Sequence, residues 1–103
     1  MIARNYGDVT VVFEVPLSAN AIRTLRRMEE DAAFARELRA VRLLLARLER
    51  DPFDPRLRSR QFVTDDLGHV RATAVGYDDW YVFWQVRGTP ARIEIIEIAE
   101  VPL

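Results

Sequence analysis

Three side chains in the second half of the chain have the types that could hold a phosphate and move protons. Arg71 carries a guanidinium, which suits an anionic oxygen. His69 is the only histidine, and Tyr81 carries a phenol, so either could take part in proton transfer. These three residues are the candidate catalytic groups. The plainer interpretation of His69 is a surface residue beside a turn.

Other kinds of site find little support in the sequence. There is no glycine-rich phosphate loop and no cysteine, and carboxylates with suitable spacing do not surround His69. We therefore expect neither a metal nor a cofactor. The paired carboxylates at 65–66 and 78–79 are typical of turns, because an aspartate side chain bonds nearby backbone amides.

The charge of the chain differs between its two halves. All fifteen basic residues are arginine, and the formal net charge is −1. Residues 23–60 contain eleven arginines and seven acids, whereas residues 61–103 contain three arginines and seven acids. A general nucleic-acid binder usually has a net basic balance, and this chain does not. Most of the helical arginines are explained by a solvated helix face.

The size and composition indicate a single compact domain over residues 1–103. The chain is half hydrophobic and has no low-complexity tract, so a folded core is expected. The absence of cysteine is consistent with a reducing cytoplasm, and no apolar run approaches the length of a membrane span. We expect a cytoplasmic protein without a membrane partner.

The first half predicts one strand and two helices. Alternating apolar residues predict a β-strand over Val9–Val15, which Pro16 ends. Ser18 is placed to cap a helix whose apolar face is formed by Ala21, Ile22, Leu25 and Met28. A second helix is predicted from about Ala32 to Arg50, with an apolar stripe at Phe34, Leu38, Val41, Leu44 or Leu45, and Leu48.

The second half predicts three or four antiparallel strands. The prolines at 52 and 55 end the second helix, and the pattern then changes to period two. Predicted strands cover 61–64, 69–75, 80–86 and 92–98, separated by short turns. The strand at 80–86 is aromatic or β-branched at its first five positions, which predicts burial on both faces. The fold class is α+β, with both helices on one face of the sheet.

The order of these elements resembles the RelE/ParE superfamily of bacterial toxins. The matching segments are VVFEVPLSANAIRTLRRM, LLLARLERDPFDPRLRSRQF, GYDDWYVFWQV and IEIIEI, which together cover nearly the whole chain. The resemblance implies an N-terminal strand, a helical hairpin and an antiparallel sheet. It also implies the toxin of a type II toxin–antitoxin pair, neutralised by a cognate antitoxin and directed at ribosome-bound mRNA or at DNA gyrase.

The resemblance also implies where an endonuclease site would lie. Members of this family usually have an arginine in the core strand, at the position that Tyr81 occupies here. Arg71 matches another position that is commonly basic in the family. A cleavage site would therefore combine Arg71, holding the phosphate, with His69 or Tyr81, moving protons.

Two toxin functions follow and differ in mechanism, and a third alternative is a structural or interaction domain with no toxin role. The first is an RNA endonuclease (an mRNA interferase), with Arg58, Arg60 and Arg87 as candidate RNA contacts. The second is a binding module of the same fold that acts without catalysis, on gyrase or only on its antitoxin. Tyr81 in place of arginine and the acidic second half favour the second function, because acidic groups repel phosphates.

Overall fold

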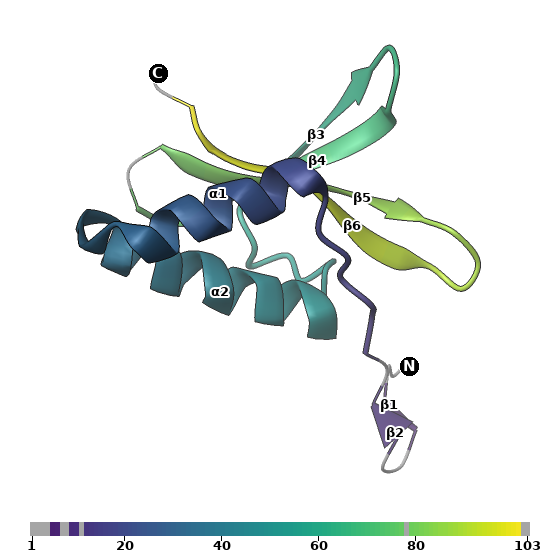
Figure 1. Ribbon diagram of the computed structural model, residues 1–103. Helices are drawn as coiled ribbons and strands as arrows, with labels where there is room; N and C mark the ends of the chain where they lie inside the picture. Colours follow the sequence, from purple (N-terminus) through teal and green to yellow (C-terminus); the bar gives the residue numbers. More distant parts are fainter. Residues whose placement is uncertain (1–4, 7–8, 11, 78, 102–103) are drawn as a thin grey trace.

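The computed structural model describes residues 5–6, 9–10, 12–77 and 79–101. Two α-helices lie against one face of a four-stranded antiparallel sheet (Figure 1). The helical segments are α1 (Ala19–Glu30), the short 3₁₀ turn η1 (Ala32–Phe34) and α2 (Ala35–Arg50). The sheet contains β3 (Ser59–Thr64), β4 (Gly68–Ala74), β5 (Trp80–Arg87) and β6 (Arg92–Glu100), adjacent in chain order. The predicted helical hairpin and antiparallel sheet are confirmed.

The predicted strand over Val9–Val15 is wrong. Val9–Thr10 forms the two-residue strand β2, which pairs with β1 (Asn5–Tyr6). Val11 lies outside the described residues, and residues 12–16 are not in a strand. The alternating apolar pattern marks a segment that contacts the core, since Phe13 and Val15 pack against it.

A missing donor explains why this segment is not a strand. It runs parallel to β6, where the N–H groups of Ile93 and Ile95 donate to the carbonyls of Glu14 and Pro16, both at 2.9 Å. The N–H of Ser18 in turn donates to the carbonyl of Ile95 at 2.9 Å. The preceding bond of a parallel ladder would start from the nitrogen of Pro16, which has no hydrogen. The segment therefore lines the β6 edge with an incomplete ladder.

Ser18 connects the start of α1 to the sheet. Its Oγ accepts a hydrogen bond from the N–H of Ala21 at 3.1 Å, as a helix cap does, and donates to the carbonyl of Ile96. The predicted cap is confirmed. The apolar face is turned slightly from the predicted one, because Thr24 is buried with Ala21 and Met28 while Ile22 is exposed.

The second helix buries one side of its leucine-rich stretch. Asp31 caps η1 by accepting from the N–H of Ala33 at 3.0 Å, so the acidic run separates the two helices. Leu44 is buried while Leu45 is only partly so, and Leu43 is 62 % exposed. The other buried leucines and valine of α2 are Leu38, Val41 and Leu48. In the described part of the chain, no helix could span a membrane.

The main core lies between the helices and strands β5 and β6. Trp80, Val82 and Trp84 of β5 are buried there, together with three isoleucines of β6: Ile93, Ile95 and Ile98. The register shifts by one residue between Phe83 and Trp84, so β6 has a bulge. This extra residue brings Ile98 to the same face as Ile95, whereas strict alternation would place it on the opposite face.

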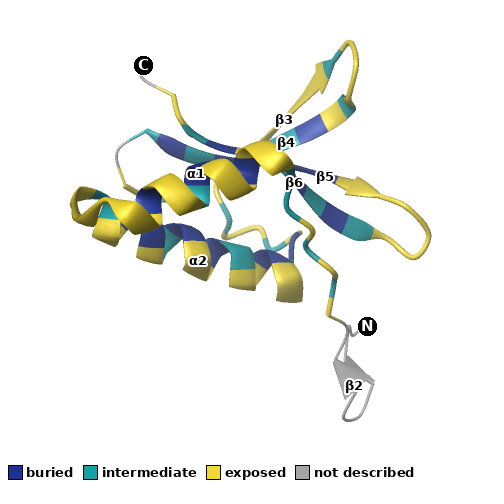
Figure 2. Ribbon diagram, viewed as in Figure 1, coloured by how far each residue is buried: buried dark blue, intermediate teal, exposed yellow. Residues whose placement is uncertain are grey.

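The opposite face of the sheet is not covered by the helices. Tyr81 and Phe83 lie there and are only partly buried, so the prediction that β5 is buried on both faces is wrong. Figure 2 shows that β3 is exposed along most of its length. The rings of Phe62 and Phe83 meet edge to face, with centroids 6.4 Å apart. Val70 and Ala72 of β4, between these strands, are buried outside the main core cluster.

A chain of hydrogen bonds fixes Trp84 in the core. The indole Nε1 of Trp84 donates to the Oγ1 of Thr73 at 2.8 Å, and this hydroxyl is 2.7 Å from the Oγ of Ser59. Trp84 and Thr73 are fully buried. Three strands of the sheet are thereby joined by side chains as well as by backbone bonds.

Thr73→Val should destabilise the protein by about 1–3 kcal/mol, because the buried indole N–H loses its acceptor. Thr73→Ser, which keeps the hydroxyl, is the matched control and should lose clearly less. Urea unfolding followed by tryptophan fluorescence measures both changes. Equal losses in the two variants would contradict the role of this hydrogen bond.

The connection from α2 to β3 is held by an aspartate that binds its neighbour. The Oδ1 of Asp54 accepts from the backbone N–H of Arg56 at 2.9 Å, and its Oδ2 lies 2.9 Å from the guanidinium Nη2. These hydrogen bonds to Arg56 lower the pKa of Asp54 from 3.8 to about 2. The same contact raises the pKa of Arg56.

The Asp54 interaction should make stability depend on pH in the acid range. Because the folded-state pKa is lowered to about 2, the ionised carboxylate stabilises the fold above the unfolded pKa of 3.8, and this contribution is lost as the pH falls toward 2. The difference in unfolding free energy between wild type and Asp54→Asn should be constant from about pH 7 to pH 5 and shrink below about pH 4. A difference that stays constant to pH 2 would contradict the assignment.

Candidate nucleic-acid interface

Strand register places Tyr81 and two of the candidate arginines on the uncovered face. Tyr81 pairs with Ala74, and the N–H of Ala74 donates to the carbonyl of Arg58 at 2.9 Å. Arg60 pairs with Ala72, which pairs with Phe83. Directly paired residues share a face of the sheet. Tyr81, Phe83, Arg58 and Arg60 therefore lie on one surface.

Arg71 and His69 lie on the other face. Arg71 pairs with Trp84, whose side chain is in the main core, and His69 lies two positions before Arg71 on the same strand. Side chains two residues apart on a strand point to the same side. The structure therefore brings Arg71 and His69 together but separates both from Tyr81. The three proposed catalytic groups do not meet at one point.

Two rows of side chains cross the uncovered face. The first row runs from Arg58 through Ala74 and Tyr81 to Ala99, and the second from Arg60 through Ala72 and Phe83 to Glu97. Each row has an arginine, from β3 or the residue just before it, a small residue on β4 and an aromatic ring on β5. The rings of Tyr81 and Phe83 are 6.3 Å apart, and Phe62 extends this aromatic group toward β3.

Arg58 and Arg60 differ from Arg87 in whether a carboxylate lies near the guanidinium. In the described part of the chain, no aspartate or glutamate forms an ion pair with Arg58 or Arg60. Arg87 has its Nε 3.8 Å from Oε1 of Glu94, and Arg92 Nη2 lies 2.9 Å from the other carboxylate oxygen. Arg58 and Arg60 can therefore meet a phosphate without first losing a carboxylate, and Arg87 cannot.

Charge changes sign across the uncovered face. Arg58 and Arg60 lie on the β3 side, and the exposed Glu97 lies on the β6 side of the second row. Phosphate groups would be attracted to the first side and repelled from the second. The aromatic rings lie between them. This arrangement favours a strand of nucleic acid that follows β3 and turns its bases toward β5.

Arg71 is held by aromatic rings. Its guanidinium carbon lies 5.2 Å from the ring centroid of Phe53 and 5.6 Å from that of Trp84. Neighbouring Gln61 has its Nε2 3.0 Å from Nδ1 of His69, which is exposed as expected for a residue beside a turn. These contacts give Arg71 a structural role beside the core.

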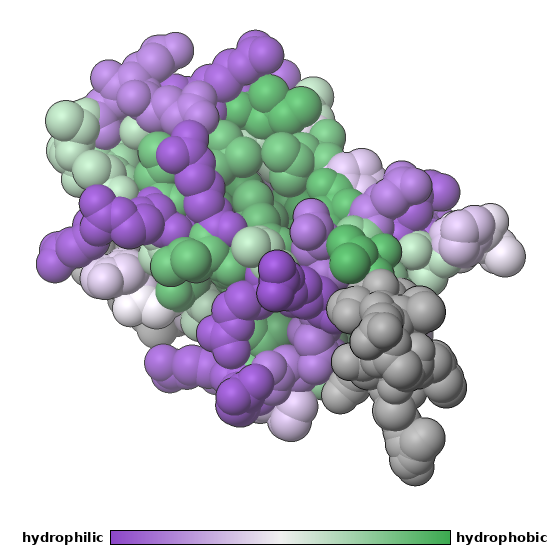
Figure 3. Space-filling view, turned by 90° about the horizontal axis from the view of Figure 1, so that it is seen from below, coloured by the Kyte–Doolittle hydropathy of each residue, from purple (hydrophilic) through white to green (hydrophobic). Residues whose placement is uncertain are grey.

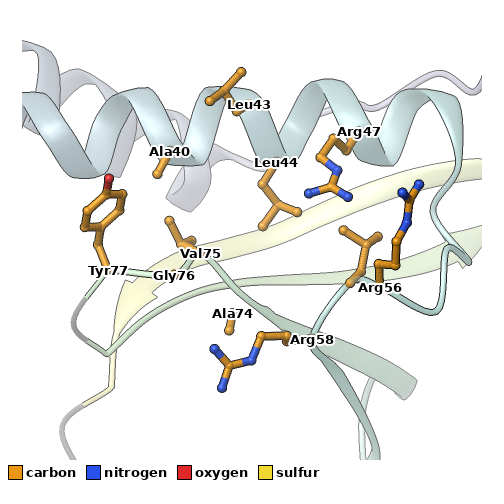
Figure 4. Close-up of a pocket in the computed structure, with 11 residues that line it drawn as sticks. Ala40, Leu43, Leu44, Arg47, Arg56, Arg58, Ala74, Val75, Gly76 and Tyr77 are labelled. Carbon is orange, nitrogen blue, oxygen red and sulfur yellow. The ribbon is translucent and has the colours of Figure 1, made fainter.

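A shallow pocket of about 310 Å³ lies between α2 and the connection that leads into β3 (Figure 4). Leu44 points from α2 toward the sheet, and Val75 lies below it (Figure 4). Two of the pocket arginines, Arg47 and Arg56, lie near Asp54. Seen from below in Figure 3, hydrophobic side chains gather over the middle of the molecule, with hydrophilic ones around them. Arg58 lines this pocket as well as the uncovered face.

No metal site is found in the ranges that the structure describes, because no three of their histidine or carboxylate side chains lie close enough together. Two members of the candidate site, Phe62 and Phe83, are not among the site residues predicted from the sequence. Their positions carry a signal, since each lies two residues after a candidate residue, Arg60 and Tyr81. Period two places Phe62 on the face of Arg60 and Phe83 on the face of Tyr81, and the strand register then places both pairs on one face.

The overall architecture is shared with solved bacterial toxins. A chain titled as a YoeB/ParE toxin from Agrobacterium tumefaciens superposes with a TM-score of 0.70, at 13 % identity, over 86 % of this chain and 99 % of that chain. The YoeB dimer from Staphylococcus aureus gives a TM-score of 0.64, at 10 % identity, over 82 % of this chain and 92 % of that one. No family model and no curated protein matches the sequence. At these identities the likeness defines the fold.

Proposed function

We propose that this protein is the toxin of a bacterial type II toxin–antitoxin pair and that its uncovered sheet face binds single-stranded RNA. The fold shared with YoeB/ParE toxins supports the first part. One observation carries the second part: Arg58 and Arg60, which form no ion pair with a carboxylate of the described residues, lie at and just before β3 beside the aromatic group of Phe62, Tyr81 and Phe83.

The chemistry of these groups matches that of an RNA strand. Guanidinium groups contact phosphate oxygens, and unstacked bases lie on aromatic rings, at about 1–3 kcal/mol for each stacked base. Each phosphate contact makes the affinity salt-dependent, with a slope of about −0.7 in log affinity against log salt for a single strand. Arg58 and Arg60 together should contribute a slope of about −1.4.

Cleavage of the bound RNA would involve Tyr81. Its ring lies in the same row as Arg58, two strands away, so their backbones are about 10 Å apart and both side chains project from the same face. The 2′-hydroxyl oxygen would attack the phosphorus and lose its proton to water while the P–O5′ bond breaks, and Tyr81 would donate its phenolic proton to the departing 5′-oxygen. Arg58 would stabilise the negative charge on the phosphate. In this proposal Arg71 and His69 support the sheet and do not touch the reacting atoms.

The second candidate is a toxin that binds without cleaving, acting on gyrase or engaging only its antitoxin. The exposed Glu97 favours it, because this carboxylate lies in the same row as Phe83 and repels phosphates. In either case a cognate antitoxin neutralises the protein.

RNA binding should depend on Arg58 and Arg60. The double variant Arg58→Ala, Arg60→Ala should bind a fluorescent single-stranded RNA more weakly, and its salt slope should be smaller by about 1.4. Arg71→Ala and Arg87→Ala remove the same charge elsewhere and serve as matched controls with little loss. Fluorescence anisotropy at several salt concentrations measures these changes. Equal weakening by Arg71→Ala would contradict the assigned face.

Growth arrest on expression from a tight promoter should separate the two candidate functions. Wild type should arrest growth, and co-expression of the adjacent antitoxin gene should relieve the arrest. If the protein is an endonuclease, Tyr81→Phe should abolish RNA cleavage and arrest while keeping RNA affinity. Arrest by both forms without cleavage would establish the binding module, and no arrest by wild type would contradict the toxin assignment.

A further inference from the structure

The sheet has one edge that the rest of the described chain leaves open. The β6 edge is lined by the segment at 14–18, which hydrogen-bonds to it. At the opposite edge, β3 pairs only with β4 (Figure 1). Figure 2 shows this edge exposed, with the helices lying elsewhere on the sheet. Such an edge is a template for another strand.

The register identifies which backbone groups of β3 point outward. The bond from the N–H of Ala74 to the carbonyl of Arg58 makes these residues a hydrogen-bonded pair. Such pairs alternate along an antiparallel ladder, so the even-numbered residues of β3 face β4 and the odd-numbered ones face away. Gln61 and Val63 therefore present their N–H and carbonyl groups to the outside, and no described residue bonds to them. The N–H of Ser59 bonds locally to the carbonyl of Leu57 at 3.0 Å.

Two neighbouring side chains of this edge strand are apolar and exposed. Val63 is 69 % exposed and Phe62 is 40 % exposed, on opposite faces of the strand. The strand contains no proline, a residue that commonly blocks edge pairing, and Arg60 is its one charged residue. Pairing with another strand would bury both side chains and satisfy the outward backbone groups.

We propose that β3 pairs antiparallel with β3 of a second copy of this chain, with the two-fold axis at Gln61. In this register Gln61 lies opposite Gln61 of the second copy, and Val63 lies opposite Ser59. The two glutamines exchange two backbone hydrogen bonds, and each Val63 N–H donates to the opposite Ser59 carbonyl. Four backbone bonds thus form without breaking the bond between Ser59 and Leu57.

The side chains of β3 are complementary to themselves in this register. On the uncovered face, Arg60 lies opposite Phe62 of the second copy, and this pair occurs twice. A guanidinium beside an aromatic ring is a favourable pair. Arg58 lies opposite Thr64. No two like charges are opposed, which is the condition that self-pairing of a basic strand must satisfy.

The pairing would change the surface on which RNA is proposed to bind, and this consequence rests on the proposed function. The two sheets become one, and their uncovered faces join along β3. Arg58, Arg60 and Phe62 of both copies then form the centre of a single surface. The dimer itself depends only on the edge and would exist without RNA.

Opposite charges at Gln61 test the two-fold axis directly. Gln61→Glu and Gln61→Lys each place like charges opposite each other in the dimer, while in the monomer residue 61 is exposed. Wild type should dimerise in sedimentation velocity between about 5 µM and 500 µM, a range suited to a small interface. Each variant alone should dissociate at least about tenfold more readily, and an equimolar mixture should recover the dimer as a heterodimer.

Controls keep this experiment decisive. Arg39→Gln makes the same change in charge as Gln61→Glu on an exposed part of α2, and it should leave the dimer intact. Circular dichroism confirms that each variant is folded. A wild type that stays monomeric at about 500 µM would overturn the proposal. So would dimers of both variants as tight as wild type, or a mixture that stays monomeric, because the contact or the axis would then lie elsewhere.

Discussion

The structure depends on one constraint: two helices are enough to cover only one face of a four-stranded sheet. The covered face holds the main core, in which Trp84 is fixed by its bond to Thr73 and surrounded by residues of α1, α2 and β6. Burial of such side chains supplies most of the stability, at about 1.5–3 kcal/mol for each large apolar residue. The other face has to be stable without a cover. It achieves this with a small cluster, in which Phe62 and Phe83 lie over Val70 and Ala72.

The one-sided cover also decides which residues can act together. Alternation along the strands sends Arg71 and His69 to the helix side and Tyr81 to the open side, so Arg71 shares a face with His69 and not with Tyr81. The open side instead combines aromatic rings with arginines that pair with no carboxylate of the described residues. Among the described residues, β3 is also the edge strand of the sheet, with β4 on one side and no strand on the other. Phe62 belongs both to the proposed RNA surface and to the proposed dimer edge.

The elements were predictable from the sequence because local patterns determine them. The cap at Ser18, the stripe of α2 and the four sheet strands all follow from side-chain periodicity and from the positions of proline and glycine. Features that depend on tertiary pairing were not predictable. The N-terminal strand is lost because Pro16 lacks one donor, and the β6 bulge reverses the expected face of Ile98. The position of Tyr81 relative to Arg71 required the register between β4 and β5, which no local pattern contains.

The central claim is that RNA lies on the uncovered face of the sheet. Ultraviolet crosslinking of bound single-stranded RNA, followed by mass spectrometry of the peptides, tests it most directly. Each face of the sheet has aromatic residues, so the crosslinked peptides show which face the RNA contacts. Crosslinks at Phe62, Tyr81 or Phe83 are the predicted result. Crosslinks confined to Phe53 or Tyr77, which lie on the helix side and at the pocket beside α2, would contradict the account.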